Sequence, residues 1–301
     1  FFLYTLTLLL PGHRLQAAFP ATGDQNSGQI PHAPDFAGES PMSELSNLHI
    51  NDFCQDSLGY MWIATSRGLN KYNGYEYIHY FHEKSNPNSL PNDHVTTLFL
   101  DSRGILWIGT LGGMACYDGT NDTFRRIGIE DQTDGRYVFR FGEDGQGNIW
   151  VGHIDGICLV PPGETCGRWN LNLKTAERAW GNMKTFRFSP DSSLVIGLEH
   201  AVLDYDIRRG TYRVLDQFPA TLNDLAADYR EVWVATSHGV RRLDRRAGRP
   251  SALPAAMEAC PVLKNSEINR IECIDPTRIW IASNHTPHGY DSQTGQVREV
   301  G

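Results

Sequence analysis

An all-β fold is predicted by three features of the 301-residue sequence. One phrase, Asp-Ser-Arg-Gly-Ile-Leu-Trp-Ile-Gly-Thr at residues 101–110, recurs closely at 56–65 and 144–152 and in weaker form at 192–197, 231–236 and 278–283. The copies are 39 to 47 residues apart when Trp62, Trp107, Trp150, Leu194, Trp233 and Trp280 are taken as one position. Helical periodicity is almost absent, and Gly, Asn and Asp crowd the turns. A fixed period of this length is typical of a β-propeller, in which each repeat forms one four-stranded blade.

The second copy shows how each blade element follows from its residues. Residues 95–100 are an apolar run suited to the innermost strand, and residues 101–104 form a turn in which Asp101 accepts backbone N–H groups and Gly104 supplies a positive φ. Large apolar and small or polar residues alternate over 105–110, which predicts the second strand. Residues 114–117 then form the third strand and 123–127 the outer edge.

The repeat tryptophans are predicted to fill the spaces between neighbouring blades, where an adjacent Gly or Ala lets the next sheet approach closely. Because no blade can bury both of its faces alone, the blades must stack to be stable. The predicted structural core positions are Trp62, Trp107, Trp150, Trp233 and Trp280.

The repeat pattern also sets the domain organisation. Residues 1–18 resemble the end of a secretory signal peptide, and residues 19–42 are a polar lead-in rich in Gly, Pro and Ser. The propeller is predicted over 43–301, with six blades at about 43–90, 91–134, 135–178, 179–219, 220–264 and 265–301. Seven is a common blade number, so we expect a seventh blade beyond residue 301 and treat the sequence as a fragment.

Composition excludes several classes of function. The net charge is −8 and no basic run is visible, which argues against a nucleic-acid partner. The six cysteines fall mostly at strand positions that need a small apolar residue, so buried free thiols are favoured over a disulfide framework, although Cys158 and Cys166 are close in sequence. No cysteine spacing matches a metal site, and we expect neither a metal nor a cofactor.

The motifs at residues 92–113 and 68–74 resemble the two-component regulator propeller repeat. The first reads Asn-Asp-His-Val-x-x-Leu-x-x-Asp-Ser-x-Gly-x-Leu-Trp-Ile-Gly-Thr-x-x-Gly, and the second reads Gly-Leu-Asn-Lys-Tyr-Asn-Gly. The resemblance is strong over the first three blades and weakest in the fourth, where Leu194 stands in for the tryptophan. It implies the periplasmic sensor of a hybrid two-component system, whose intact parent is a sensor histidine kinase anchored in the inner membrane through regions beyond this chain. It further implies detection of oligosaccharides, control of glycan-utilisation genes, and a second propeller or a dimer partner.

A ligand surface is predicted where the second-to-third-strand turns and the blade-to-blade connections share one face around the central channel. Both sets of loops carry polar, charged and aromatic residues that the repeat does not require, among them His49, His94, Gly112 and Asn223. For any single one of them, ordinary solvent exposure explains the residue equally well. The ligand-binding candidates are Arg67, Arg136, Tyr137, Asp155, Trp180, Glu199, His238 and His285.

Two other functions stay open at this point. Streptogramin lyases are propellers with a similar core phrase, and His153, Glu199, His238 and His285 could be imagined as a metal and general-base site for such an enzyme. A propeller that only binds other proteins is the second alternative. The sensor function is preferred, and no catalytic residue is assigned in this chain.

Overall fold

A computed structural model describes residues 44–130, 137–173, 177–189, 193–228, 230–275 and 277–299. Residues 46–301 form one compact unit. The predicted signal-peptide remnant, the lead-in and Arg136 lie outside the described residues. Within those residues, no helix is both long and apolar enough to cross a membrane.

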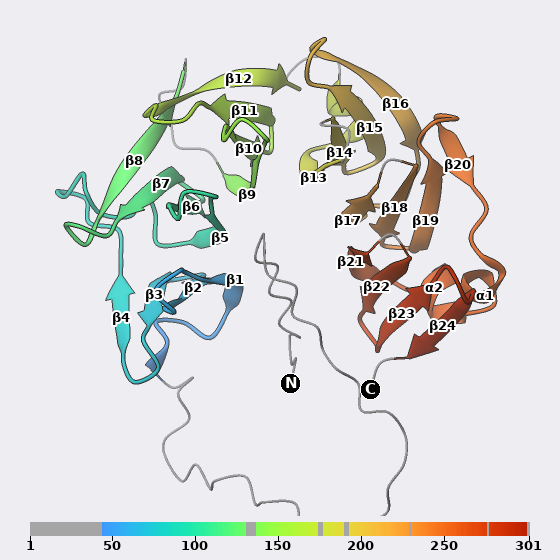
Figure 1. The fold of residues 1–301 in the computed structure, drawn as a ribbon, viewed down its shortest axis with the longest axis horizontal. Coiled ribbons are helices and arrows are strands. Elements are labelled where there is room, and N and C mark those ends of the chain that lie inside the picture. The colour runs from blue at the N-terminus through green and yellow to red at the C-terminus, as the bar shows by residue number, and fades with distance from the viewer. Residues whose placement is uncertain are drawn as a thin grey trace, which may run out of the picture. The chain divides into compact units, whose positions relative to one another are not determined.

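The described residues form an all-β structure of 24 strands, with consecutive strands antiparallel within each repeat (Figure 1). Four sheets have four strands each, and the sheet β5–β12 joins the second and third repeats through a short parallel pairing of their outer strands β8 and β12. The strands of the first three repeats are β1 (Ile50–Gln55), β2 (Met61–Thr65), β3 (Gly68–Tyr72), β4 (Tyr77–Tyr80), β5 (Val95–Leu100), β6 (Leu106–Thr110), β7 (Gly113–Asp118), β8 (Thr123–Ile129), β9 (Val138–Glu143), β10 (Ile149–His153), β11 (Gly156–Val160) and β12 (Cys166–Asn172). Those of the last three are β13 (Met183–Phe188), β14 (Leu194–Leu198), β15 (Ala201–Asp206), β16 (Thr211–Gln217), β17 (Leu222–Ala227), β18 (Glu231–Thr236), β19 (Gly239–Asp244), β20 (Arg249–Ser251), β21 (Ile268–Asp275), β22 (Arg278–Ser283), β23 (Pro287–Asp291) and β24 (Gln296–Glu299).

The first strand of each repeat is innermost, as the apolar runs predict. In Figure 1 strands β1, β5, β9, β13, β17 and β21 lie nearest the centre of the repeats, and each contacts the next along this series. The arrangement is that of a β-propeller, and it brings six inner strands around one central space.

The repeat tryptophans pack each sheet against the next. Trp107 of β6 is 3% exposed and lies in one cluster with Val138, Phe141 and Val151 of the following repeat. Gly109 beside it permits this approach, because a Cβ there would lie 2.9 Å from Val138 Cγ1. Trp62, Trp150 and Trp233 are buried in the same way.

Each of the first three repeats ties its tryptophan to its first turn. Asp56, Asp101 and Asp144 each accept two backbone N–H groups of their own turn, as turn chemistry predicts. The second carboxylate oxygen of each also accepts the indole N–H of the tryptophan six residues later, at 2.8, 3.1 and 2.9 Å. The turn aspartate therefore fixes the orientation of the core side chain.

The fourth repeat corrects the sequence alignment by one residue. Val195 pairs with Arg187 as Trp150 pairs with Gly142, so Val195 and not Leu194 occupies the tryptophan position. Val195 packs against the fifth repeat, whereas Leu194 faces the third. The turn position five residues later is consequently His200 rather than Glu199.

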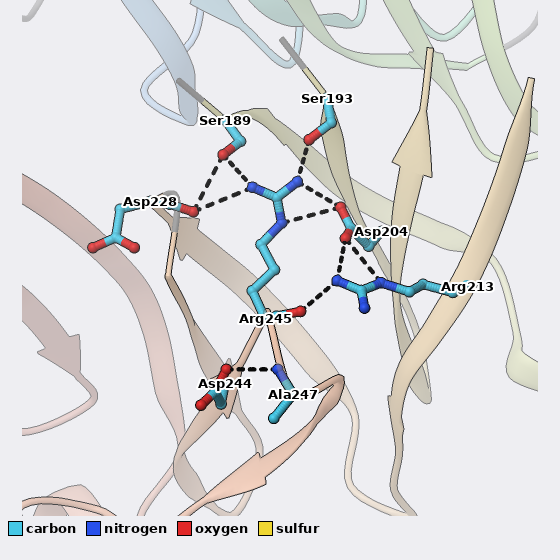
Figure 2. Close-up of polar contacts among 8 residues, drawn as sticks. All are labelled: Ser189, Ser193, Asp204, Arg213, Asp228, Asp244, Arg245 and Ala247. Carbon is cyan, nitrogen blue, oxygen red and sulfur yellow. Dashed lines mark hydrogen bonds and ion pairs between the residues drawn. The ribbon is translucent and has the colours of Figure 1, made fainter. Parts of the chain in front are cut away.

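A buried arginine from the fifth repeat supports this altered first hairpin (Figure 2). The guanidinium of Arg245, whose side chain is 4% exposed, donates to Asp204 Oδ1 at 2.6 and 3.0 Å and to the hydroxyls of Ser189 and Ser193. Arg213 binds the other oxygen of Asp204 at 2.9 Å. A polar clamp thus links the fourth and fifth sheets near the turn where other repeats use an Asp–Trp pair.

Trp280 differs from the core position predicted for it. Its side chain is 36% exposed, while Trp233 one repeat earlier is 3% exposed against the last sheet. The reason is positional: this face of each sheet is covered by the next sheet, and no described sheet follows β21–β24.

Two short helices, α1 (Ala255–Glu258) and α2 (Pro261–Asn265), form an insertion that the repeat pattern did not predict. Met257 and Leu263 point from them into the core between the fifth and sixth sheets and are fully buried. All six cysteines are free, in agreement with the preference for thiols over a disulfide framework.

Candidate functional site

Every inner strand carries a β-bulge near its start. In β1, Ile50 pairs with Thr65 and Asp52 with Ala64, which leaves Asn51 as an extra residue without a partner on β2. The other five inner strands show the same register shift at the equivalent point. A bulge bends the strand and changes the direction of its side chains. The extra residues are Asn51, Thr96, Phe139, Lys184, Asn223 and Asn269.

These bulges line a hollow of about 320 Å³ at one end of the inner strands. Five of the six bulge residues contribute to it. Four further lining residues each directly follow a bulge residue, and the other two directly precede an inner strand. All six repeats take part. The lining residues are Asn51, His94, Thr96, Tyr137, Phe139, Arg140, Lys184, Thr185, Asn223, Asp224 and Arg270.

Several of these polar side chains hold neighbouring inner strands together. Asn51 Nδ2 donates to the Val95 carbonyl at 2.7 Å, and Asn223 Nδ2 donates to the Ile268 carbonyl at 2.9 Å. Each has an aspartate as its next residue, and that aspartate accepts a backbone N–H of the following inner strand. These Asn-Asp pairs therefore stabilise the contacts between neighbouring inner strands at the hollow.

The charged groups of the hollow are mostly cationic. Asp224 is 2% exposed and is neutralised by Arg187 at 2.9 Å, with Arg270 at 4.0 Å. Lys184 makes an ion pair with Glu199 at 3.4 Å. Arg140 directly follows the bulge residue of β9, as Asp52 and Asp224 do in β1 and β17, and the described residues offer its guanidinium no hydrogen-bond or ion-pair partner.

Burial lowers the pKa of Arg140 to about 10, and the nearby cations Arg187 and Arg270 contribute to the decrease. The guanidinium still carries its full charge at neutral pH. The carboxylates of Asp224 and Asp52 act in the opposite direction, although neither forms an ion pair with Arg140. A half-buried cation that has lost part of its hydration and has no hydrogen-bonded counterion costs free energy. An oxyanion placed in the hollow would supply that partner.

Of the eight predicted ligand residues, Tyr137 alone lines this hollow among those the structure describes. Its ring is 38% exposed, and it makes an edge contact with Phe139 at 6.0 Å. Glu199 does not line the hollow, but it forms an ion pair with Lys184, which does. Trp180 is half-buried against the core of the fourth repeat and contacts Tyr212. Arg67, Asp155, His238 and His285 are not among the residues that line the hollow.

The histidines considered for a metal-dependent enzyme do not come together. His153 is fully buried beside Cys158 and Trp169, and His238 is exposed with Ser237 as its partner at 2.8 Å. Within the described part of the chain, no group of three or more His, Cys, Asp or Glu residues is placed to hold a metal ion. This geometry gives no support to the lyase alternative.

The charged residues of the hollow, Arg140, Lys184, Asp224 and Arg270, are not among the ligand residues predicted from the sequence, because the inner strands were expected to be apolar runs. The sequence does carry a signal for them: every inner strand begins with Ile, Val, Met or Leu and has a polar or charged residue at its second or third position. Besides Tyr137, the connection residues His94 and Asn223 also line the hollow.

A larger hollow of about 520 Å³ lies beside the Arg245 clamp. Its lining includes Arg208, Arg209 and Arg213 as well as Asp204 and Asp206. Asp204 accepts hydrogen bonds from Arg213 and Arg245, and Asp206 forms an ion pair with Arg209 at 3.7 Å. Both carboxylates of this lining are therefore already paired with arginines.

Two segments of the chain, residues 44–67 and 89–112, match the two component regulator propeller family. These two segments are similar to the repeat of this family, as the sequence motifs indicated. No protein with a curated description is significantly similar to it.

Solved structures share the fold. The extracellular domains of the hybrid two-component systems BT3049 and BT4673 from B. thetaiotaomicron superpose with TM-scores of 0.67 and 0.66 at 19% and 18% identity. Each alignment covers 87% of this chain but only 36% and 38% of those chains, respectively. Virginiamycin B lyase from Staphylococcus aureus gives a TM-score of 0.59 at 12% identity, over 84% of both chains. At these identities the likeness establishes the β-propeller fold.

Proposed function

We propose that this chain is the ligand-sensing propeller of a hybrid two-component system, and that the hollow formed by the six bulges binds its ligand. The family repeats and the fold shared with extracellular domains of such systems support the sensor function. The convergence of polar side chains from all six repeats on one hollow is the observation that carries the site. The chain would act outside the cytoplasm, as the extracellular domains of BT3049 and BT4673 do.

The ligand class we propose is an oligosaccharide, and the output is control of genes for its use. A sugar needs many hydrogen bonds and an aromatic surface, and the hollow provides both. Thr96, Thr185 and His94 contribute polar groups, and the exposed ring of Tyr137 provides a face for a pyranose. The chain itself is proposed to bind and not to catalyse.

Signalling requires that the ligand bind two arrangements of the sensor with different affinity. A propeller with six inner strands tied by side-chain hydrogen bonds is stiff, so we propose that the moving unit is the whole propeller relative to a second propeller or a dimer partner. Equal oligosaccharide affinity in the signalling-on and signalling-off states of the intact sensor would contradict this.

Binding of the chain to an array of plant and host oligosaccharides, followed by calorimetry on the glycans that bind, tests the site. Tyr137→Ala should weaken binding at least about tenfold, since it removes the stacking surface. The matched control is Tyr75→Ala, because Tyr75 is 93% exposed and does not line the hollow. Equal affinity of the Tyr137 variant and the wild type would place the ligand elsewhere.

A further inference from the structure

The clearest unassigned feature of the hollow is the guanidinium of Arg140. It extends from the bulge of β9 into the hollow, and no carboxylate of the described residues forms an ion pair with it, although Asp224 and Asp52 are near enough to act on its charge. Asp52 and Asp224, at the equivalent positions of β1 and β17, each accept backbone N–H groups of the next inner strand. Arg140 cannot take this role, because a guanidinium only donates. Its position is therefore not explained by strand-to-strand ties.

The surroundings add to the positive charge at this place. Lys184 and Arg270 line the same hollow, and the single lining carboxylate, Asp224, is already paired with Arg187 at 2.9 Å. Lys184 is itself paired with Glu199 at 3.4 Å, so Arg140 carries most of the uncompensated positive charge of the lining, in a chain whose net charge is −8. A field of this kind attracts an anion and repels a second cation.

We propose, resting on the proposed function of the hollow, that its ligand is an acidic oligosaccharide whose carboxylate or sulfate group binds Arg140. An arginine fork can hold either group through two parallel hydrogen bonds. Lys184 and Arg270 supply further positive charge around the bound group, and Tyr137 contacts the sugar ring that carries it. Neutral oligosaccharides would leave Arg140 unpaired and bind more weakly.

Matched pairs of probes that differ only in charge provide the test. The first pair is tetragalacturonate and its methyl ester, and the second is a sulfated lactosamine disaccharide and its desulfated parent. An array of acidic and neutral glycans extends the comparison. We expect the wild-type chain to bind the acidic member of a pair more tightly than the neutral member, and the two pairs distinguish a carboxylate ligand from a sulfate ligand.

The decisive variant is Arg140→Met, which keeps most of the side-chain length and removes the charge. It should weaken binding of the acidic glycan at least about thirtyfold, as expected when one partner of a charged pair is lost. Arg140→Lys keeps the charge but loses the fork, so intermediate binding is expected. Arg125→Met is the control, since Arg125 is an exposed arginine on β8 away from the hollow.

Thermal unfolding separates binding from folding. Because Arg140 is an unpaired, half-buried charge, Arg140→Met should keep or raise the Tm while it loses the ligand. Neutral glycans that bind, depend on Tyr137 and ignore Arg140 would overturn the charge inference and leave the proposed function intact. Failure of the wild type to bind any glycan on the array would overturn both.

Discussion

The carboxylate of Asp101 accepts the indole N–H of Trp107 at 3.1 Å, across six residues of chain. Asp101 is 4% exposed and Trp107 is 3% exposed, so the hydrogen bond is shielded from water. The same pair occurs in the first and third repeats. It joins the tight turn between the first and second strands of the repeat to the side chain that packs against the next sheet.

Trp107→Ala should lower the free energy of unfolding by about 3–5 kcal/mol, because it leaves a large cavity between two sheets. Urea denaturation followed by circular dichroism measures this. The Asp101 oxygen that accepts the indole N–H also accepts the Arg103 guanidinium, at 2.6 and 3.2 Å, so it keeps a partner in the variant and the loss should come mainly from the cavity.

Two controls accompany that variant. Trp280→Ala should cost clearly less, because Trp280 is 36% exposed and no described sheet covers it. His238→Ala should change the free energy of unfolding by no more than about 0.5 kcal/mol, as is usual for an exposed side chain. Similar losses for all three variants would show that the assignment of inner and outer positions is wrong.

Arg245→Met should lower the free energy of unfolding by about 3 kcal/mol, near the lower end of the range for breaking a buried charged pair. The reason is that Ser189, Ser193 and Asp204 all lose a charged donor, although Arg213 still reaches Asp204 (Figure 2). Arg213→Met is the matched control on the same carboxylate. Its side chain is 50% exposed, so a change within ~1 kcal/mol is expected. An equal effect of the two substitutions would argue against the clamp.

Acid should weaken the third repeat through Asp144. Partial burial by itself raises the pKa of this carboxyl, but hydrogen bonds from the Trp150 indole and from Asn148 outweigh it and hold the pKa below its ordinary value. A lowered folded-state pKa contributes stability that is complete above about pH 4 and is lost as the pH falls through the folded value. Urea midpoints between pH 6 and pH 2.5 should therefore fall more steeply for the wild type than for Asp144→Asn. Parallel curves would contradict this assignment.

Thiol reactivity should follow burial. Burial raises the pKa of Cys54, Cys116, Cys158 and Cys273 to about 12, so almost none of these thiols is ionised at neutral pH. Cys166 is the exposed cysteine. A chromogenic disulfide reagent at pH 7.5 should label Cys166 rapidly in the native chain and all six cysteines after unfolding. Loss of the rapid phase in Cys166→Ser checks the assignment, and rapid labelling of two or more buried cysteines would refute it.

Much of the fold was predictable from the sequence because several copies of one motif carry the same pattern of strands and turns. Trp62, Trp107 and Trp150 each stand in the same phrase, so turn chemistry, strand alternation and period agree. Prediction failed where the phrase was altered or incomplete. In the fourth repeat, alignment by similarity placed Leu194 at the tryptophan position, and strand register assigns that position to Val195. For Trp280, the tryptophan of the phrase is kept, but no described sheet covers it.

The sequence by itself determined the four-stranded repeat, its inner strand and the side of each sheet that faces its neighbour, because hydrophobic period and turn residues are local properties. Only the tertiary structure decided the candidate site. A bulge is a mismatch of two residues against one across a pair of strands, and a single strand does not reveal it. Six such bulges bring Tyr137, Arg140, Lys184 and Arg270 to one hollow, although they lie as far as 133 residues apart in the chain. Whether Arg140 has a counterion is likewise a question of which side chains surround it in space.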